Sequence, residues 1–129
     1  MINFLLKNPS LYRFYQKTVR RKYDEYDFIK FIFKKKIFKN VRVLDICCGD
    51  SYILEYIHEY IDDYLGVDNN DKYLSQCKNR WKKFNFQHLN LNDKSNIDYF
   101  LKFRPNFIFI NGAIHHLDDK TVQSINAFI

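Results

Sequence analysis

The sequence predicts an α/β fold in which helices cover both faces of a mostly parallel sheet. Three observations carry this prediction. Short runs of β-branched and apolar residues alternate with segments whose apolar residues recur every three or four positions. Each short run ends at small or polar turn residues. The chain has 129 residues, of which 47% are hydrophobic and 28% charged, as expected for a single domain with a buried core.

The N-terminal part of the chain is expected to be helical. Apolar side chains between residues 10 and 36 recur at helical spacing, and a break near 22–25 indicates two helices rather than one. We expect residues 1–38 to form an N-terminal helical segment and residues 39–129 to form the α/β core.

Strands and helices alternate through the rest of the chain. The expected strands cover residues 41–47, 64–67, 85–89 and 106–110. The expected helices cover residues 53–61, 71–83, 93–103 and 121–128. This alternation implies a parallel sheet joined by right-handed crossovers. Ligands bind such sheets at the carboxyl ends of the strands, so the residues just after each strand are the candidate site.

The first expected strand leads into a turn of small and acidic residues. The candidates here are Asp45, Cys47, Cys48, Gly49, Asp50 and Ser51. Small side chains let a backbone pass close to a ligand, and the following helix would direct free N–H groups to the same place. The turn lacks a complete G-x-G-x-x-G spacing, so it is a weak signal by itself.

Polar side chains also follow the second and third strands. Asp68 lies 19 residues beyond Gly49, about the separation at which a carboxylate accepts hydrogen bonds from two ribose hydroxyls. The alternative is a simple turn residue, but the combination with the first turn favours ribose binding. Asn90 and the backbone of Leu91 suit the edge of a purine, and a helix-capping role for Asn90 is equally consistent.

Each glycine of the chain lies in or just after an expected strand. These glycines are Gly49, Gly66 and Gly112. Close approach of a ligand would require glycine at such positions, and so would turn chemistry or tight packing of a helix on the sheet.

Taken together, these segments resemble the class I S-adenosylmethionine (SAM)-dependent methyltransferases that act on small molecules. Residues 43–51 are similar to the first motif of that family, L-D-x-G-C-G-x-G, and residues 64–68 to its acidic second motif. Residues 86–91 resemble the adenine-contacting third motif, and residues 107–119 the segment after the fourth strand. Residues 8–16 resemble the N-terminal helix of small-molecule members. The resemblance implies a Rossmann-like three-layer sandwich, of which this sequence holds the N-terminal half with about four strands.

The resemblance also implies roles for the candidate residues. The backbone of residues 47–51 would hold the methionine end of SAM, and Asp45 would receive its amino group directly or through water. Asp68 would take the ribose hydroxyls, and Asn90 would face the adenine amine. The remaining expected cofactor-binding residues are Asn69, Leu91 and Asn111.

The sequence departs from the family pattern at three of these positions. Cys47 and Ser51 stand where the family usually has glycine, and we expect both to be tolerated because they are small. Asn90 replaces the usual Asp, but its carbonyl oxygen can still accept a hydrogen bond from an amine.

Other chemistry-bearing residues follow the fourth strand. His115 or His116 would be the base if the acceptor must lose a proton, and the alternative is a structural role for both. A metal site built from these histidines with Asp118 and Asp119 is disfavoured, because adjacent His side chains usually diverge. A Cys47 or Cys48 nucleophile lacks a nearby base in the sequence.

We therefore expect methyl transfer from SAM to a small molecule, with S-adenosylhomocysteine (SAH) as the second product. The alternatives are a non-catalytic SAM-binding remnant or subunit, and nucleic-acid methylation guided by basic residues. Residues 1–42 carry twelve Lys and Arg against three Asp and Glu, a formal charge of +9, whereas residues 43–129 carry −3. A solvated helical face explains the basic residues more simply than a polyanion partner does, and the chain has no Asn-Pro-Pro-Tyr-type base-flipping motif.

Cysteine content and length give the remaining expectations. Three cysteines without C-x-x-C spacing favour a reducing, cytoplasmic location, and no apolar run is long enough for a membrane-spanning helix. The sequence ends before the fifth strand of the resembled fold. The sheet edge and apolar face left open would favour self-association or a partner.

Overall fold

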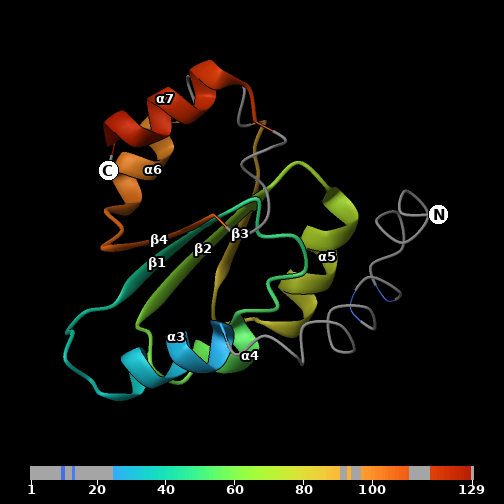
Figure 1. Cartoon of the computed structure of the whole chain (residues 1–129). Helices are drawn as coiled ribbons and strands as arrows, with labels where there is room; N and C mark the ends of the chain where they lie inside the picture. The colour runs from blue at the N-terminus through green and yellow to red at the C-terminus, as the bar shows by residue number, and fades with distance from the viewer. Residues whose placement is uncertain are drawn as a thin grey trace.

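The fold is built on one parallel sheet. The computed structural model describes residues 10, 13, 25–90, 93, 97–110 and 117–128. Its strands are β1 (Arg42–Ile46), β2 (Asp63–Asp68), β3 (Asn85–His88) and β4 (Phe107–Ile110). They lie in the order β3-β2-β1-β4, and every neighbouring pair is parallel. The order places β1 and β2 in the middle of the sheet (Figure 1).

Helices cover both faces of the sheet, as Figure 1 shows. The first face carries α3 (Glu25–Lys34), α4 (Leu54–Ile57) and α5 (Asp71–Arg80). The second face carries α6 (Ile97–Phe103) and α7 (Asp119–Phe128), drawn in orange and red. The result is the expected Rossmann-like three-layer sandwich.

Alternation along the central strands divides the core into two clusters. Val43 of β1 and Tyr64 of β2 are fully buried on the first face. Their neighbours Leu44 and Leu65 are buried on the second face, where Phe100 of α6 covers them. Strands that are buried on both faces read as nearly continuous apolar runs, which is the pattern that predicted them.

The helix expected over residues 53–61 is much shorter in the structure. Only Leu54–Ile57 is α-helical, and tight turns precede it. The amides of Leu54, Glu55 and Tyr56 donate to carbonyl oxygens three residues earlier in the chain, at 2.9–3.1 Å. These bonds use N–H groups that were expected to be free at the turn after β1, so these three amides are not available to a ligand there.

The N-terminal helical prediction is described in part. Ser10 and Arg13 lie in helical backbone, and α3 spans Glu25–Lys34. The chain then leaves the helix, and Lys36 adopts a left-handed φ of 50°. The expected break near residues 22–25 lies mainly outside the described residues.

An apolar surface remains at the β4 side of the molecule. Strand β4 is an edge strand, and all four of its residues are half-buried. Large apolar side chains are exposed on α3 and just after it, namely Phe28 (64%), Phe31 (56%), Ile37 (72%) and Phe38 (43%). Within the described part of the chain, no helix has the length and apolar character needed to cross a bilayer.

Candidate functional site

The carboxyl ends of β1 and β2 bring the main candidate residues together. Asp45 of β1 lies opposite Gly66 of β2, so the turn at residues 47–51 emerges beside Asp68 at the end of β2. Asp68 in turn lies opposite His88 of β3. Parallel register thus gathers residues that are far apart in the sequence at one edge of the sheet.

Asp68 is fixed against the turn after β1. Its Oδ2 accepts a hydrogen bond from the Gly49 amide at 2.9 Å, and its Oδ1 accepts one from the Asn70 amide at 2.9 Å. A carboxylate has about four acceptor positions, so these two bonds leave capacity for two further donors. The side chain is only partly buried. Asp68 therefore has a structural role in the loop and retains acceptors for hydroxyl groups.

The turn after β1 has an unusual backbone. Cys47, Gly49 and Ser51 adopt φ values of 57°, 54° and 52°, all in the left-handed region. This region costs a residue with a side chain about 1–2 kcal/mol. Cys47 and Ser51 thus stand where backbone conformation favours glycine, and their small size does not remove that strain. A Cβ added to Gly49 would meet no atom of the described residues within 4 Å, so this part of the structure leaves space above Gly49.

The N–H groups of this turn are largely engaged within the protein. Cys48 donates to the Val67 carbonyl oxygen at 3.0 Å, and Ser51 donates to the Cys48 carbonyl oxygen at 2.8 Å. The Gly49 amide is bound to Asp68. The turn therefore offers a ligand chiefly carboxylate and carbonyl acceptors, which suit hydroxyl and ammonium groups better than anions.

Gly66 is required for packing rather than for contact with a ligand. A Cβ at this position would lie 2.9 Å from Phe86 Cδ1, 3.0 Å from Cys48 Sγ and 3.0 Å from Tyr64 Cε1. Of the two explanations open for this glycine, the structure supports tight packing.

A buried polar network lies beneath the turn. The Tyr64 hydroxyl donates to Asp45 Oδ2 at 2.5 Å, and Asp45 is only 4% exposed. The Cys77 thiol of α5 lies 3.6 Å from the Ser51 hydroxyl and 3.5 Å from the Gly49 carbonyl oxygen. Burial raises the pKa of Asp45 to about 7, although the hydrogen bond from Tyr64 opposes this rise.

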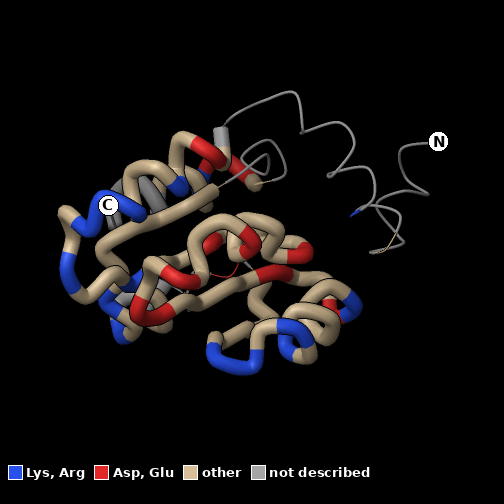
Figure 2. The backbone as a smooth tube through the Cα atoms, turned by 90° about the horizontal axis from the view of Figure 1, so that it is seen from below, with Lys and Arg blue, Asp and Glu red and all other residues tan. Residues whose placement is uncertain are grey.

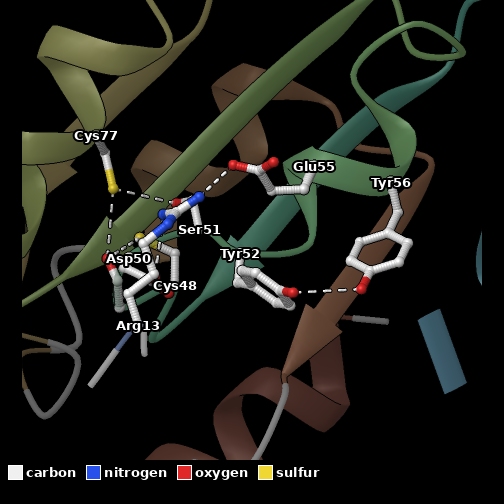
Figure 3. Close-up of polar contacts among 9 residues, drawn as sticks. Arg13, Cys48, Asp50, Ser51, Tyr52, Glu55, Tyr56 and Cys77 are labelled. Carbon is white, nitrogen blue, oxygen red and sulfur yellow. Dashed lines mark hydrogen bonds and ion pairs between the residues drawn. The ribbon is translucent and has the colours of Figure 1, made fainter. Parts of the chain in front are cut away.

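Arg13 joins the N-terminal stretch to the same turn, as Figure 3 shows. Its Nη1 lies 3.2 Å from Asp50 Oδ2, and its Nη2 contacts Glu55. Asp50 is 3% exposed, and burial raises its pKa while Arg13 opposes the rise. Arg13 belongs to the segment that resembles a family helix, but its contact with Asp50 could not be predicted because 37 residues separate the two.

The thiols near the turn are poor nucleophiles. Burial raises the pKa of Cys47 to about 12 and that of Cys77 to about 11, and it raises the pKa of Cys48 well above the ordinary value. Thiols with such pKa values remain protonated at neutral pH. The nucleophile alternative therefore has no support from this structure.

The other candidate residues are only partly accounted for. Asn69 and Asn90 are exposed at the carboxyl edge, each just beyond its strand. The carbonyl oxygen of Asn90 accepts from the Asp93 amide at 3.0 Å. Four candidates lie outside the described residues: Leu91, Asn111, His115 and His116. The described residues form no group of three or more His, Cys, Asp or Glu that could hold a metal ion.

Comparison with solved structures finds the same fold. A TehB-like SAM-dependent methyltransferase from Corynebacterium glutamicum matches with a TM-score of 0.61 and 19% identity, over 94% of this chain and 66% of its own. The plantazolicin methyltransferase BamL, crystallised with SAH and a triazolic desmethylPZN analog, matches with a TM-score of 0.65 and 21% identity, over 91% of this chain and 43% of its own. A SAM-dependent methyltransferase from Clostridium acetobutylicum matches with a TM-score of 0.62 and 16% identity, over 89% of this chain and 48% of its own.

The chain is shorter than these proteins: it spans between 43% and 66% of the length of each matched structure. A search of the curated proteins finds no match. The family model described as a methyltransferase domain matches residues 43–128, which is most of the chain. The match covers all of β2, β3 and β4, and all of β1 except Arg42. The chain therefore belongs to the methyltransferase-domain family, and its fold is that of the class I SAM-dependent methyltransferases.

Proposed function

We propose that this protein binds SAM at the carboxyl ends of β1 and β2 and transfers its methyl group to a small molecule. The observation that carries the proposal is the 2.9 Å hydrogen bond between the Gly49 amide and Asp68, which fixes a carboxylate beside a turn of small residues. The family match makes SAM the cofactor to expect at such a site. SAM supplies an activated methyl group on a sulfonium centre.

The residues present fit an adenosyl ligand. The described residues leave space above Gly49, and Asp68 retains acceptors for the two ribose hydroxyls. Asp45 is a buried carboxyl group, and an ammonium group of the ligand would provide a positive charge beside it. The remaining expected contacts, from Asn69, Asn90, Leu91 and Asn111, form part of this proposal.

A small acceptor suits the site better than nucleic acid does. The carboxyl edge carries the carboxylates of Asp68, Asp71 and Asp93, which would repel a phosphate backbone. Lys34 ends α3, and Lys35, Lys36 and Lys39 follow in the connection to β1, which enters the sheet at the opposite edge. Figure 2 shows blue segments at the outer left, red segments nearer the middle, and further blue segments at the lower middle and right.

The catalytic step needs positioning, exclusion of water and, for some acceptors, removal of a proton. We propose His115 or His116 as the base in that case, because both follow the fourth strand in the sequence. Replacing the base with Gln should lower kcat by about 100-fold or more and leave the Kd for SAM unchanged. If both His115→Gln and His116→Gln retain full kcat, neither residue is the base.

The proposal is tested with SAM labelled in its methyl group. The purified chain is incubated with a small-molecule extract, and transfer of label to a metabolite is measured. Asp68→Asn should weaken SAM binding by about tenfold or more, because it removes one charged acceptor for the ribose. Asp27→Asn, an exposed residue of α3, is the matched control. SAM binding without methyl transfer would favour the non-catalytic alternative, and the absence of SAM binding would refute the proposal.

We also propose that the open β4 edge and the exposed side chains Phe28, Phe31 and Ile37 are covered in solution by a second copy or by further polypeptide. Sedimentation velocity of the wild type and of Phe31→Ser provides the test. A monomer at all accessible concentrations would contradict self-association.

A further inference from the structure

The hydrogen bond between Tyr64 and Asp45 links strands β1 and β2 beneath the turn at residues 47–51. Tyr64 is fully buried, and its hydroxyl donates to Asp45 Oδ2 at 2.5 Å. Asp45 does not lie directly opposite Tyr64 in the sheet; its register partner is Gly66, two residues further along β2. The Tyr64 ring must therefore extend along the strand toward the carboxyl edge to reach Asp45.

Gly66 provides the space for this arrangement. A Cβ at Gly66 would lie 3.0 Å from Tyr64 Cε1, which shows that the ring passes over the glycine. The ring is held on its other sides by Phe84 and Phe86, each with its ring centroid 5.7 Å away. The Tyr64 hydroxyl therefore has a defined position next to Asp45.

The turn beside this bond is also tightly packed. Ser51 is 1% exposed. The Cys77 thiol donates to the Ser51 hydroxyl at 3.6 Å. Of these bonds, the one from Tyr64 ends on Asp45 itself, so removal of the Tyr64 hydroxyl would affect the Asp45 carboxyl group directly.

We propose that Tyr64 is a positioning residue that orients the Asp45 carboxyl group toward the ammonium group of the amino acid end of the cofactor. This inference rests on the proposed SAM-binding function. Among the described residues, Tyr64 is the one side chain that donates a hydrogen bond to Asp45. The bond occupies Oδ2 and leaves Oδ1 to accept from the ligand.

The charges around Asp45 make this orientation sensitive to pH. The titratable groups that face Asp45 come from the turn, β2 and α5, and they are Cys47, Cys48, Asp50, Tyr64, Asp68 and Cys77. None of them carries a positive charge. Burial and, to a smaller extent, the neighbouring carboxylates Asp68 and Asp50 raise the pKa of Asp45 to about 7, against the opposing effect of the Tyr64 hydrogen bond. An ammonium group binds the ionised form, so binding should strengthen as pH rises through about 7.

A comparison of two ligands distinguishes a loss of Asp45 orientation from general damage to the binding site. SAH carries the ammonium group, whereas 5′-methylthioadenosine has the same adenosyl group and no amino acid end. Both are titrated by calorimetry between pH 5.5 and 8.5 into the wild type and Tyr64→Phe. Tyr60→Phe is the matched control, because Tyr60 also packs against the first core cluster but lies just before β2, at the opposite edge of the sheet.

The expected result is a selective effect on SAH. Tyr64→Phe should weaken SAH binding about tenfold at pH 7 and leave the affinity for 5′-methylthioadenosine within twofold of the wild type. The midpoint of the pH dependence of SAH binding should move to higher pH in Tyr64→Phe, because the variant lacks the bond that favours ionised Asp45. Tyr60→Phe should behave as the wild type does.

Other results would overturn the inference. Equal weakening of both ligands would show a merely structural role for Tyr64, and unchanged SAH binding would show no role. If Tyr64→Phe fails to fold, the wild type still decides the matter, because a pH-independent affinity for SAH would exclude the arrangement. If the wild type binds neither ligand, the proposed function itself fails; if it binds both and the variant shows no selectivity, only the positioning role of Tyr64 fails.

Discussion

Replacement of Asp45 by Asn should make the protein more stable at alkaline pH while impairing cofactor binding. Asp45 is 4% exposed, and its pKa rises from 3.8 to about 7 in the folded protein. One pKa unit corresponds to about 1.36 kcal/mol, so ionising this buried group costs the fold about 4 kcal/mol. Asn removes this cost but leaves a buried amide N–H₂ that needs an acceptor, which offsets about 1–2 kcal/mol. The net gain expected for Asp45→Asn is about 2 kcal/mol at pH 8.5.

The direction of the pH dependence follows from the raised pKa. Below about pH 4 the carboxyl group is protonated in both the folded and unfolded states, and ionisation costs nothing. Between pH 4 and 7 the unfolded chain ionises first, so the wild type loses stability as pH rises, and above about pH 7 the loss is complete.

Urea unfolding followed by circular dichroism at pH 4.5 and 8.5 measures both proteins. The wild type should be equal to Asp45→Asn or more stable at pH 4.5, and the order should reverse at pH 8.5. A stability difference that stays constant between the two pH values would refute the reasoning, because it would show that Asp45 is ionised as easily in the fold as in the unfolded chain.

Three further substitutions test the architecture around the turn. Gly66→Ala should lower the free energy of unfolding by about 1–3 kcal/mol, because its Cβ would lie 2.9 Å from Phe86; thermal unfolding that matches the wild type would contradict this packing. Cys47→Gly removes about 1 kcal/mol of left-handed strain at φ 57°, and the greater entropy of glycine in the unfolded chain partly offsets this gain. Urea unfolding should therefore show that the variant is as stable as the wild type or more stable. A loss of more than about 1 kcal/mol would contradict the strained backbone. Arg13→Gln should destabilise the protein more at pH 7 than at pH 4, because it removes the guanidinium group that contacts the buried carboxylate of Asp50; an equal loss at both pH values would show that the pair does not matter.

The sequence predicted the sheet well because its signals are local. Strands β1, β2 and β4 are mostly runs of β-branched and apolar residues, and all four strands appear within a few residues of their expected bounds. The alternation with helices was enough to imply parallel strands. The helix after β1 was overestimated, since the apolar spacing from Ile53 to Ile61 also suits a short helix followed by turns.

The site was predicted where a motif has fixed spacing and missed where contacts are long-range. The separation of 19 residues between Gly49 and Asp68 indicated that the two would meet, and they form a hydrogen bond. Nothing in the sequence distinguishes Tyr64 from an ordinary strand residue, because its contact with Asp45 depends on strand register and on the missing side chain of Gly66. The small size of Cys47 suggested tolerance, but backbone conformation is not visible in composition.

The central claim is that the turn after β1 and Asp68 together hold an adenosyl group. A crystal structure of the protein with SAH tests it most directly. We expect the ribose hydroxyls within hydrogen-bond distance of the Asp68 carboxylate and the adenosyl group against the backbone near Gly49. A ligand bound elsewhere, or this edge of the sheet filled by the protein's own side chains at saturating SAH, would contradict the claim.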